Sequence, residues 1–160
     1  MLFRSILDRR GRLPLSLRLL APAEEGEAPG RRLYATTRHV GARRLKLLAG
    51  RGIDAVVVGE GPRGLDLEEL LDRLARSGIS QVLVEGGPAL AGSFLDLGLA
   101  REVAAYIAPR LLGGKLSRGS LEGRGATGLD FTPWISNPGV HRLGRDFLIE
   151  GRIHNSRAQE

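Results

Sequence analysis

The order of apolar and polar positions along the chain predicts strands that alternate with helices. Residues 54–60, "DAVVVGE", and residues 80–86, "SQVLVEG", are short apolar runs rich in valine and bounded by glycine, which is typical of strands buried on both faces. Between them, residues 65–78 place leucines at helical spacing, with acids in the first turn and a glycine at the end. This part of the chain therefore predicts a strand, a helix and a second strand.

The same alternation extends in both directions. The periodicity predicts a strand, two helices and a further strand, in that order, at residues 31–37, 40–50, 88–98 and 102–109. Proline in the first turn of the second helix and glycine at its end favour those bounds. We therefore predict an α/β fold with a largely parallel sheet, in which right-handed crossovers place helices on the faces of the sheet.

The composition of the sequence changes after residue 109. In residues 110–144, glycine, serine and proline separate isolated apolar residues, which predicts a long loop region. Loops of this length inside a compact domain usually carry function or lack order. Residues 146–153 then alternate in character and predict a late antiparallel strand at or near the edge of the sheet.

Length and composition limit the class of protein. A chain of 160 residues, 42% hydrophobic and 26% charged, suits one folded domain, which we assign to residues 1–153, with a short tail at residues 154–160. No apolar run reaches the roughly 18 to 20 residues that cross a bilayer, and charges come too early for a signal peptide. We therefore expect a cytoplasmic protein with no membrane partner.

Metal and nucleic-acid binding are both disfavoured. The chain has no cysteine and three scattered histidines, so we predict no metal site. Its formal net charge of +6 invites a nucleic-acid interpretation, but the arginines are spread along the chain and few aromatics interleave with them. We expect no nucleic-acid partner and a mostly solvated basic surface, part of which could receive a phosphorylated small molecule.

The most informative short stretch begins at Glu85 and continues through Gly86 and Gly87 to Pro88. It joins an expected strand to an expected helix at the carboxyl end of the strand, where ligands bind in open α/β sheets. The glycines would let a phosphate approach the backbone N–H groups that open the helix, or they only permit a tight turn. Glu85 either caps backbone amides or faces a ligand, for example the hydroxyls of a sugar. The spacing alone leaves both alternatives open.

A resemblance to a known family decides between them. Residues 82–114, "VLVEGGPALAGSFLDLGLAREVAAYIAPRLLGG", resemble the signature of the reductase domain of bacterial riboflavin biosynthesis, the C-terminal domain of a bifunctional deaminase-reductase. "SILDRRGRLPLSLRLL" resembles the strand and turn of that family ahead of its cofactor region, and "DFLIEGRI" its closing strand. The resemblance implies a three-layer, dihydrofolate-reductase-like α/β fold: a mostly parallel sheet, helices on both faces and a late antiparallel strand.

The resemblance also implies an activity. This is the NADPH-dependent reduction of a phosphorylated pyrimidine, 5-amino-6-(5-phosphoribosylamino)uracil, to its ribitylamino product, with hydride delivered to the ribose C1. Glu85 then contacts substrate, and the residues that follow it contact the cofactor: Gly87, Pro88, Ala89, Leu90, Ala91, Gly92 and Ser93. Ser93 adds a hydroxyl only where the ligand lies along the helix. We identify no catalytic acid or base, because hydride transfer is chiefly chemistry of the cofactor.

Two further cofactor candidates lie earlier in the chain. Arg9 takes a position where the family has a small hydroxyl residue; it either pairs with the 2′-phosphate of NADPH or is a surface charge on a turn. Thr36, with Thr37 beside it, lies at the end of its predicted strand. It either contacts the cofactor or is there because a β-branched residue packs well in a strand.

The chain departs from the family at its beginning. Family members carry a first strand and a substrate-binding segment that have no counterpart here, so we expect a domain that lacks its N-terminal part, with unpaired strand edges that favour association. We therefore expect a homodimer. The alternative function is a non-catalytic remnant that binds a nucleotide or pairs with another subunit. A Rossmann-type domain is a poorer alternative, because no G-x-G-x-x-G follows a strand.

Overall fold

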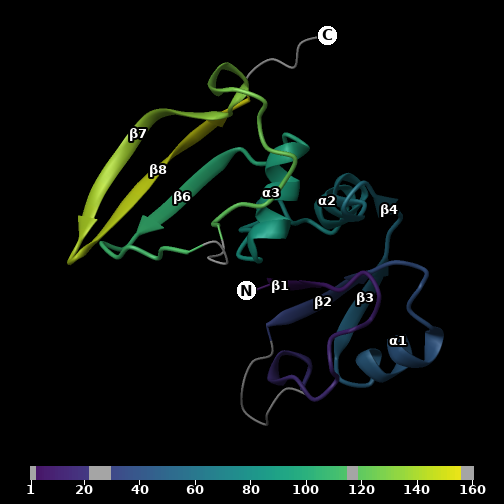
Figure 1. Ribbon diagram of the computed structural model, residues 1–160. Helices are drawn as coiled ribbons and strands as arrows, with labels where there is room; N and C mark the ends of the chain where they lie inside the picture. The colour runs from purple at the N-terminus through teal and green to yellow at the C-terminus, as the bar shows by residue number, and fades with distance from the viewer. Residues whose placement is uncertain (1–2, 22–29, 115–118, 156–160) are drawn as a thin grey trace. The chain divides into compact units, whose positions relative to one another are not determined.

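The computed structural model describes residues 3–21, 30–114 and 119–155, and the chain forms two compact units, residues 1–81 and 82–160 (Figure 1). None of the helices in the described ranges is long and apolar enough to cross a membrane.

The first unit contains a parallel sheet of three strands. These are β1 (Phe3–Leu7), β2 (Arg31–Thr36) and β3 (Ile53–Val57), in the order β1-β2-β3. Their register aligns Ile6 with Tyr34 and Tyr34 with Ala55. The strands predicted at residues 31–37 and 54–60 are thus confirmed, with the second beginning one residue earlier and ending before Val58.

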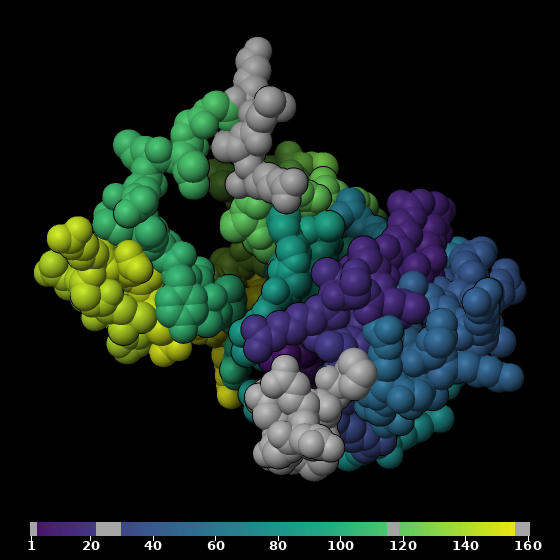
Figure 2. Space-filling view, turned by 90° about the horizontal axis from the view of Figure 1, so that it is seen from below, coloured from purple at the N-terminus to yellow at the C-terminus, as the bar shows by residue number. Residues whose placement is uncertain are grey.

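Two helices cover the two faces of this sheet (Figure 1). Helix α1 (Ala42–Ala49) packs on the face of Tyr34, in a core formed by Ile6, Leu20, Tyr34, Leu48 and Ile53. Helix α2 (Leu67–Arg76) lies over the opposite face. In the space-filling view, the segments of β1 (purple) and of β2, α1 and β3 (blue) pack against one another (Figure 2).

Short elements fix the ends of these helices and strands. Asp66 caps α2, because its side chain accepts a hydrogen bond from the Glu69 N–H over 2.9 Å. The hairpin of β4 (Glu60–Gly61) and β5 (Gly64–Leu65) joins β3 to that cap, and the 3-10 helix η1 (Arg18–Leu20) adds Leu20 to the core. The predicted helices at residues 40–50 and 65–78 are confirmed with slightly shorter bounds.

The second unit combines one helix with an antiparallel sheet. Helix α3 (Pro88–Asp96) precedes β6 (Glu102–Ile107), the 3-10 helix η2 (Leu129–Phe131), β7 (Trp134–Leu143) and β8 (Asp146–His154). The strand order is β6-β8-β7, with every neighbouring pair antiparallel. Helix α3 and the antiparallel direction of the last strand are as predicted.

The sequence prediction was wrong about the strand at residues 80–86. The structure assigns these residues to no strand, and the Leu83 side chain is 78% exposed. A valine-rich run has the propensity for a strand, but a strand also needs a neighbour whose backbone groups pair with its own. Within the described residues, no such neighbour pairs with this run.

The prediction was also wrong about residues 110–144 and about the place of the last strand. The expected loop contains the ten-residue strand β7, whose turn-forming residues Asn137 and Pro138 lie where the register with β8 shifts. Because β7 pairs with one side of β8 and β6 with the other, β8 is the central strand of its sheet, not an edge strand. A β-bulge tolerates residues that otherwise indicate a loop.

Candidate functional site

The carboxyl ends of β1, β2 and β3 meet at one edge of the parallel sheet, where two backbone hydrogen bonds continue the ladder beyond the strands. The Asp8 N–H donates to the Ala35 carbonyl over 3.0 Å, and the Val58 N–H donates to the Thr36 carbonyl over 2.8 Å. This edge therefore brings together the residues that follow the three strands, in the position where α/β proteins bind ligands.

Asp8 is the buried centre of this edge. Its carboxylate accepts hydrogen bonds from the N–H groups of Arg12 (3.0 Å) and Leu13 (2.9 Å) and from the Tyr34 hydroxyl (2.5 Å), and the Arg44 guanidinium lies 3.6 Å away. Burial acts to raise the pKa of Asp8, but these hydrogen bonds and the charge of Arg44 outweigh it, so the pKa lies below its usual value. Asp8 is therefore ionised at neutral pH and fully occupied by its own chain.

Tyr34 shares this network. Its burial, and the hydrogen bond that its hydroxyl donates to Asp8, raise the pKa of Tyr34 to about 12. The hydroxyl also accepts a hydrogen bond from the Arg44 Nε over 3.3 Å. The network holds the turn that follows β1 against β2 and α1.

Thr36 and Thr37 are both fully buried at this edge. The Thr36 hydroxyl donates to the carbonyl of Asp8 over 2.7 Å, and the Thr37 hydroxyl donates to the carbonyl of Arg9 over 2.9 Å. Both hydroxyls therefore tie the end of β2 to the turn after β1. A contact of Thr36 with a cofactor remains a prediction, and it would involve a group that already has a partner in the chain.

Arg9 is half-exposed and paired with an acid that the sequence analysis did not single out. Its Nε and Nη2 atoms donate to the two carboxylate oxygens of Glu60 over 3.0 and 3.2 Å, and the His39 Nε2 lies 2.9 Å from Glu60 Oε1. The hydrogen bond from Arg9, followed by the charges of Arg9 and His39, holds the pKa of Glu60 below its usual value. Glu60 ends the run "DAVVVGE", so its place at the end of a predicted strand was the available signal.

The start of α3 differs from the carboxyl edge of the parallel sheet, where the polar side chains have partners. Glu85 is exposed, and among the described residues its carboxylate has no hydrogen-bond or ion-pair partner. The N-cap of α3 is Gly87, with no side-chain cap hydrogen bond, so Glu85 does not cap the helix, and its contact with a ligand stays a prediction. The space where a Gly87 side chain would begin is free of other atoms within 4 Å. An anion can therefore approach the first N–H groups of the helix.

The rest of the predicted cofactor segment is packed against the chain. A Cβ on Gly92 would lie 1.2 Å from the carbonyl oxygen of Glu122, whose N–H donates to the Pro88 carbonyl over 3.0 Å. Ser93 is buried, and its hydroxyl donates to the Ala89 carbonyl over 2.8 Å. The structure thus leaves the beginning of residues 87–93 open and covers Gly92 and Ser93.

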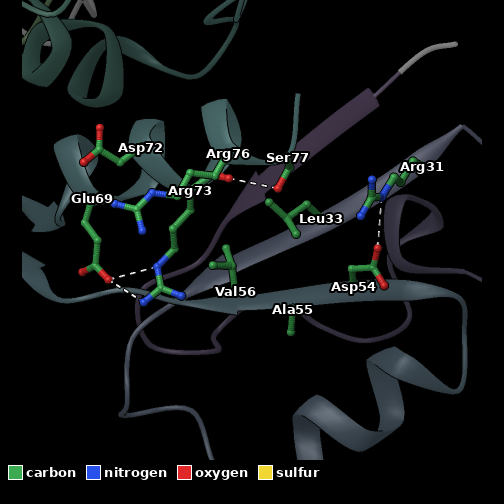
Figure 3. A pocket seen from close by; sticks show the side chains of 10 residues that line it. All are labelled: Arg31, Leu33, Asp54, Ala55, Val56, Glu69, Asp72, Arg73, Arg76 and Ser77. Carbon is green, nitrogen blue, oxygen red and sulfur yellow. Dashed lines mark hydrogen bonds and ion pairs between the residues drawn. The ribbon is translucent and has the colours of Figure 1, made fainter. Parts of the chain in front are cut away.

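The first unit also has a cavity of about 750 Å³ between α2 and the sheet (Figure 3). Arg31 and Asp54, paired over 3.2 Å, line one part of it, and Glu69 and Arg73 form a second pair on α2. None of the predicted site residues lines it. Arg31 opens β2, so this part of the cavity lies toward the amino ends of the strands, away from the edge described above.

Comparison with known proteins places the chain in a family. The RibD C-terminal domain family matches residues 2–143. The chain belongs to this family. A riboflavin biosynthesis protein RibD of Actinobacillus pleuropneumoniae is 29% identical over 147 residues, which cover 92% of the chain and 38% of that protein. A 2,5-diamino-6-ribosylamino-4(3H)-pyrimidinone 5′-phosphate reductase of Methanothermobacter thermautotrophicus is 36% identical over 96 residues, 60% of the chain and 44% of the relative.

Solved structures agree with the family on the fold. Acinetobacter baumannii RibD in form 1 superposes with a TM-score of 0.73 at 26% identity, over 95% of the chain and 37% of that protein. The riboflavin biosynthesis reductase Rib7 of Saccharomyces cerevisiae gives 0.62 at 13% identity, over 96% of the chain and 73% of that protein, and shows the fold alone. The predicted α/β class is confirmed. The chain spans about two fifths of the length of the RibD relatives it matches.

Proposed function

We propose that the chain is an NADPH-dependent reductase of riboflavin biosynthesis that converts 5-amino-6-(5-phosphoribosylamino)uracil to its ribitylamino product. One observation carries the proposal. In a chain of the RibD C-terminal domain family, Glu85 presents an exposed carboxylate, with no partner among the described residues, directly before the open start of α3. A carboxylate that stabilises nothing in its own chain is available to accept hydrogen bonds from a sugar.

The start of α3 fits the anionic part of a dinucleotide. Pro88 has no N–H to satisfy, and the open space beside Gly87 lets a phosphate approach the N–H groups of Gly87 and Ala89, for which no hydrogen bond is found within the described chain. These residues would hold the cofactor, and NADPH, when bound, supplies the hydride. In this proposal the chain binds and orients the reactants and provides no proton donor of its own.

A second substrate has support from one relative. The Methanothermobacter protein is named for reducing a 2,5-diaminopyrimidinone, and its identity of 36% exceeds that of the Actinobacillus RibD. The two substrates differ on the pyrimidine ring and share the phosphorylated ribose that Glu85 would contact. We therefore propose the uracil compound as the substrate and the diaminopyrimidinone as the alternative.

The test is NADPH binding followed by turnover. We expect NADPH fluorescence to change on titration with the full chain, and absorbance at 340 nm to fall when the uracil substrate is added. Glu85→Gln should raise KM for substrate about tenfold, the equivalent of one charged hydrogen bond, and leave NADPH affinity within about twofold. Glu68→Gln, which makes the same change of charge on the exposed surface of α2, should alter neither.

The other outcomes separate the alternatives. Turnover of the diaminopyrimidinone in place of the uracil compound would select the second substrate. Binding of NADPH with no turnover of either substrate would contradict the enzyme and favour the non-catalytic remnant. A folded chain that neither binds nor oxidises NADPH would contradict both.

We also propose that the chain forms a homodimer. In-register residues of β6, β8 and β7 put an apolar set on one face of their sheet, including Ala105, Ile149 and Val140. Val140 is 64% exposed and Phe147, on the same face, 41%. Burying such a face against a second copy is favourable by about 25 cal/mol for each Å² of apolar surface. Light scattering should give twice the chain mass.

The cytoplasmic location and the lack of nucleic-acid and membrane partners stay predictions from the sequence.

A further inference from the structure

Residues 122–124 lie along the side of α3 and are hydrogen-bonded to both ends of that helix (Figure 1). The Glu122 N–H donates to the carbonyl of Pro88, in the first turn, over 3.0 Å. The Arg124 N–H donates to the carboxylate of Asp96, the last residue of the helix, over 2.9 Å. Both contacts lie within residues 82–160 and therefore within one compact unit. We refer to residues 122–124 as the strap.

Two glycines let the strap approach α3 closely. A Cβ on Gly92, in the helix, would overlap the carbonyl oxygen of Glu122. A Cβ on Gly123, in the strap, would lie 3.0 Å from both carboxylate oxygens of Asp96, which is closer than ordinary van der Waals contact. Neither of these two glycines has a positive φ. The close approach of the two segments, and not the backbone conformation, therefore accounts for glycine at both positions.

Asp96 lies where a helix disfavours an acid. The C-terminal end of a helix carries partial negative charge, and α3 has no basic residue in its last turn to balance the carboxylate. The hydrogen bond from the Arg124 N–H offsets this repulsion. The half-buried Asp96 therefore contributes more to holding the strap than to the stability of the helix alone.

The first turn of α3 is weak by itself. The helix has nine residues, Gly92 in its interior lowers the helix propensity, and its N-cap, Gly87, makes no side-chain hydrogen bond. The ends of so short a helix fray, and a frayed turn no longer holds the N–H groups of Gly87 and Ala89 in place. The hydrogen bond from the Glu122 N–H to the Pro88 carbonyl fixes this turn.

We propose that Asp96 is a positioning residue for the cofactor: by holding the strap on α3, it keeps the start of that helix in the conformation that binds the anionic part of NADPH. The inference rests on the cofactor part of the proposed function and deepens it. A chain whose strap is loose binds NADPH only in the fraction of molecules in which the helix start is ordered. Gly92 then makes room for the strap and does not need to touch the cofactor.

The experiment measures NADPH affinity by fluorescence titration and kcat at saturating NADPH, both with the full chain. Asp96→Ala removes the acceptor of the Arg124 N–H and should weaken NADPH binding about fivefold, the equivalent of one hydrogen bond. The kcat should stay within about twofold of the natural value, because Asp96 acts on binding and not on hydride transfer. Asp96→Asn keeps an acceptor oxygen and should restore most of the affinity.

Asp66→Ala is the matched control. Asp66 is also half-buried and accepts one backbone N–H, that of Glu69, over the same distance of 2.9 Å, but it does so at the start of α2. Its replacement should lower the unfolding temperature to a similar degree and leave the NADPH affinity unchanged. Equal losses of affinity in Asp66→Ala and Asp96→Ala would show general destabilisation and overturn the inference.

Gly123→Ala tests the same contact from the side of the strap and leaves the charge of the chain unaltered. Its Cβ would press on the Asp96 carboxylate, so NADPH binding should weaken about threefold. Gly113→Ala is its control, because no other atom lies within 4 Å of the added Cβ, and it should not change the affinity. Natural affinity in both Gly123→Ala and Asp96→Ala would show that the helix start does not depend on the strap.

Amide hydrogen exchange separates this inference from the proposed function, because it needs no cofactor. Asp96→Ala should speed exchange in the strap and also at the N–H groups of Leu90 and Ala91, which donate to the Gly87 carbonyl. Faster exchange in the strap alone would overturn the inference and leave the proposed function standing. If the folded natural chain does not bind NADPH, the proposed function fails, and the role of Asp96 toward the cofactor fails with it.

Discussion

Two acids in this chain occupy similar positions in the sequence and have opposite surroundings. Asp8 and Glu85 each follow a short apolar run and precede a turn. Asp8 is 8% exposed and its carboxylate accepts three hydrogen bonds from its own chain, whereas Glu85 is exposed and has no partner among the described residues. The first holds the turn after β1 in place, and the second makes no such contact.

The comparison teaches that an acid that follows a short apolar run acquires its role from the donors around it. The turn after β1 curls back so that the Arg12 and Leu13 N–H groups point at Asp8. The residues after Glu85 enter α3 directly, and the N-cap is a glycine. Replacing Asp8 should therefore reduce stability, and replacing Glu85 should reduce binding.

The largest expected effect is that of Asp8→Ala. It leaves two backbone N–H groups and the Tyr34 hydroxyl without their acceptor in a buried site, so the free energy of unfolding should fall by about 3 kcal/mol. Asp54→Ala removes an exposed pair with Arg31 and should cost less than about 1 kcal/mol. Urea unfolding measures the loss of stability in each variant. Equal losses would show that the buried Asp8 stabilises the chain no more than the exposed Asp54.

The second-largest expected effect is the loss of stability at alkaline pH. Because the pKa of Tyr34 is about 12 in the folded chain and 10.0 is its ordinary value, the stabilisation is complete below pH 10 and is lost as the pH rises toward 12. For this fully buried hydroxyl the loss is roughly 2–3 kcal/mol. Thermal unfolding from pH 8 to pH 12 should show a steeper decline in the natural chain than in Tyr34→Phe. Parallel curves would show that the hydroxyl ionises freely.

The smallest of the three effects concerns the packed part of α3. Gly92→Ala would put a Cβ against the Glu122 carbonyl, so we expect a loss of about 1–2 kcal/mol, although alanine favours a helix over glycine. Gly50→Ala is the matched control, since its nearest atoms lie at 3.6 Å, and it should change stability by less than about 0.5 kcal/mol. Stabilisation by Gly92→Ala, measured by thermal unfolding, would mean that this face of the helix is open.

Sequence reasoning predicted the elements whose signal is local. Leucines at helical spacing, with acids in the first turn and a glycine at the end, were enough to place α2, and the last strand followed from its alternation. It missed β7, because Asn137, Pro138 and Gly139 indicate a loop when the β-bulge opposite β8 is not known. It also missed Glu60, whose partners Arg9 and His39 are 51 and 21 positions away.

The sequence by itself determined most of the alternating elements and the family, because each depends on neighbouring residues or on an ordered run of them, whereas the exposure of Glu85 came from the structure. Only the tertiary structure decided which polar groups are satisfied. It gave Asp8 and Thr36 hydrogen-bond partners within the chain, paired Arg9 with Glu60, and placed the Glu122 backbone against Gly92. Hydrogen bonds and ion pairs of this kind join residues far apart in sequence, so their partners exist only once the strands and helices have packed.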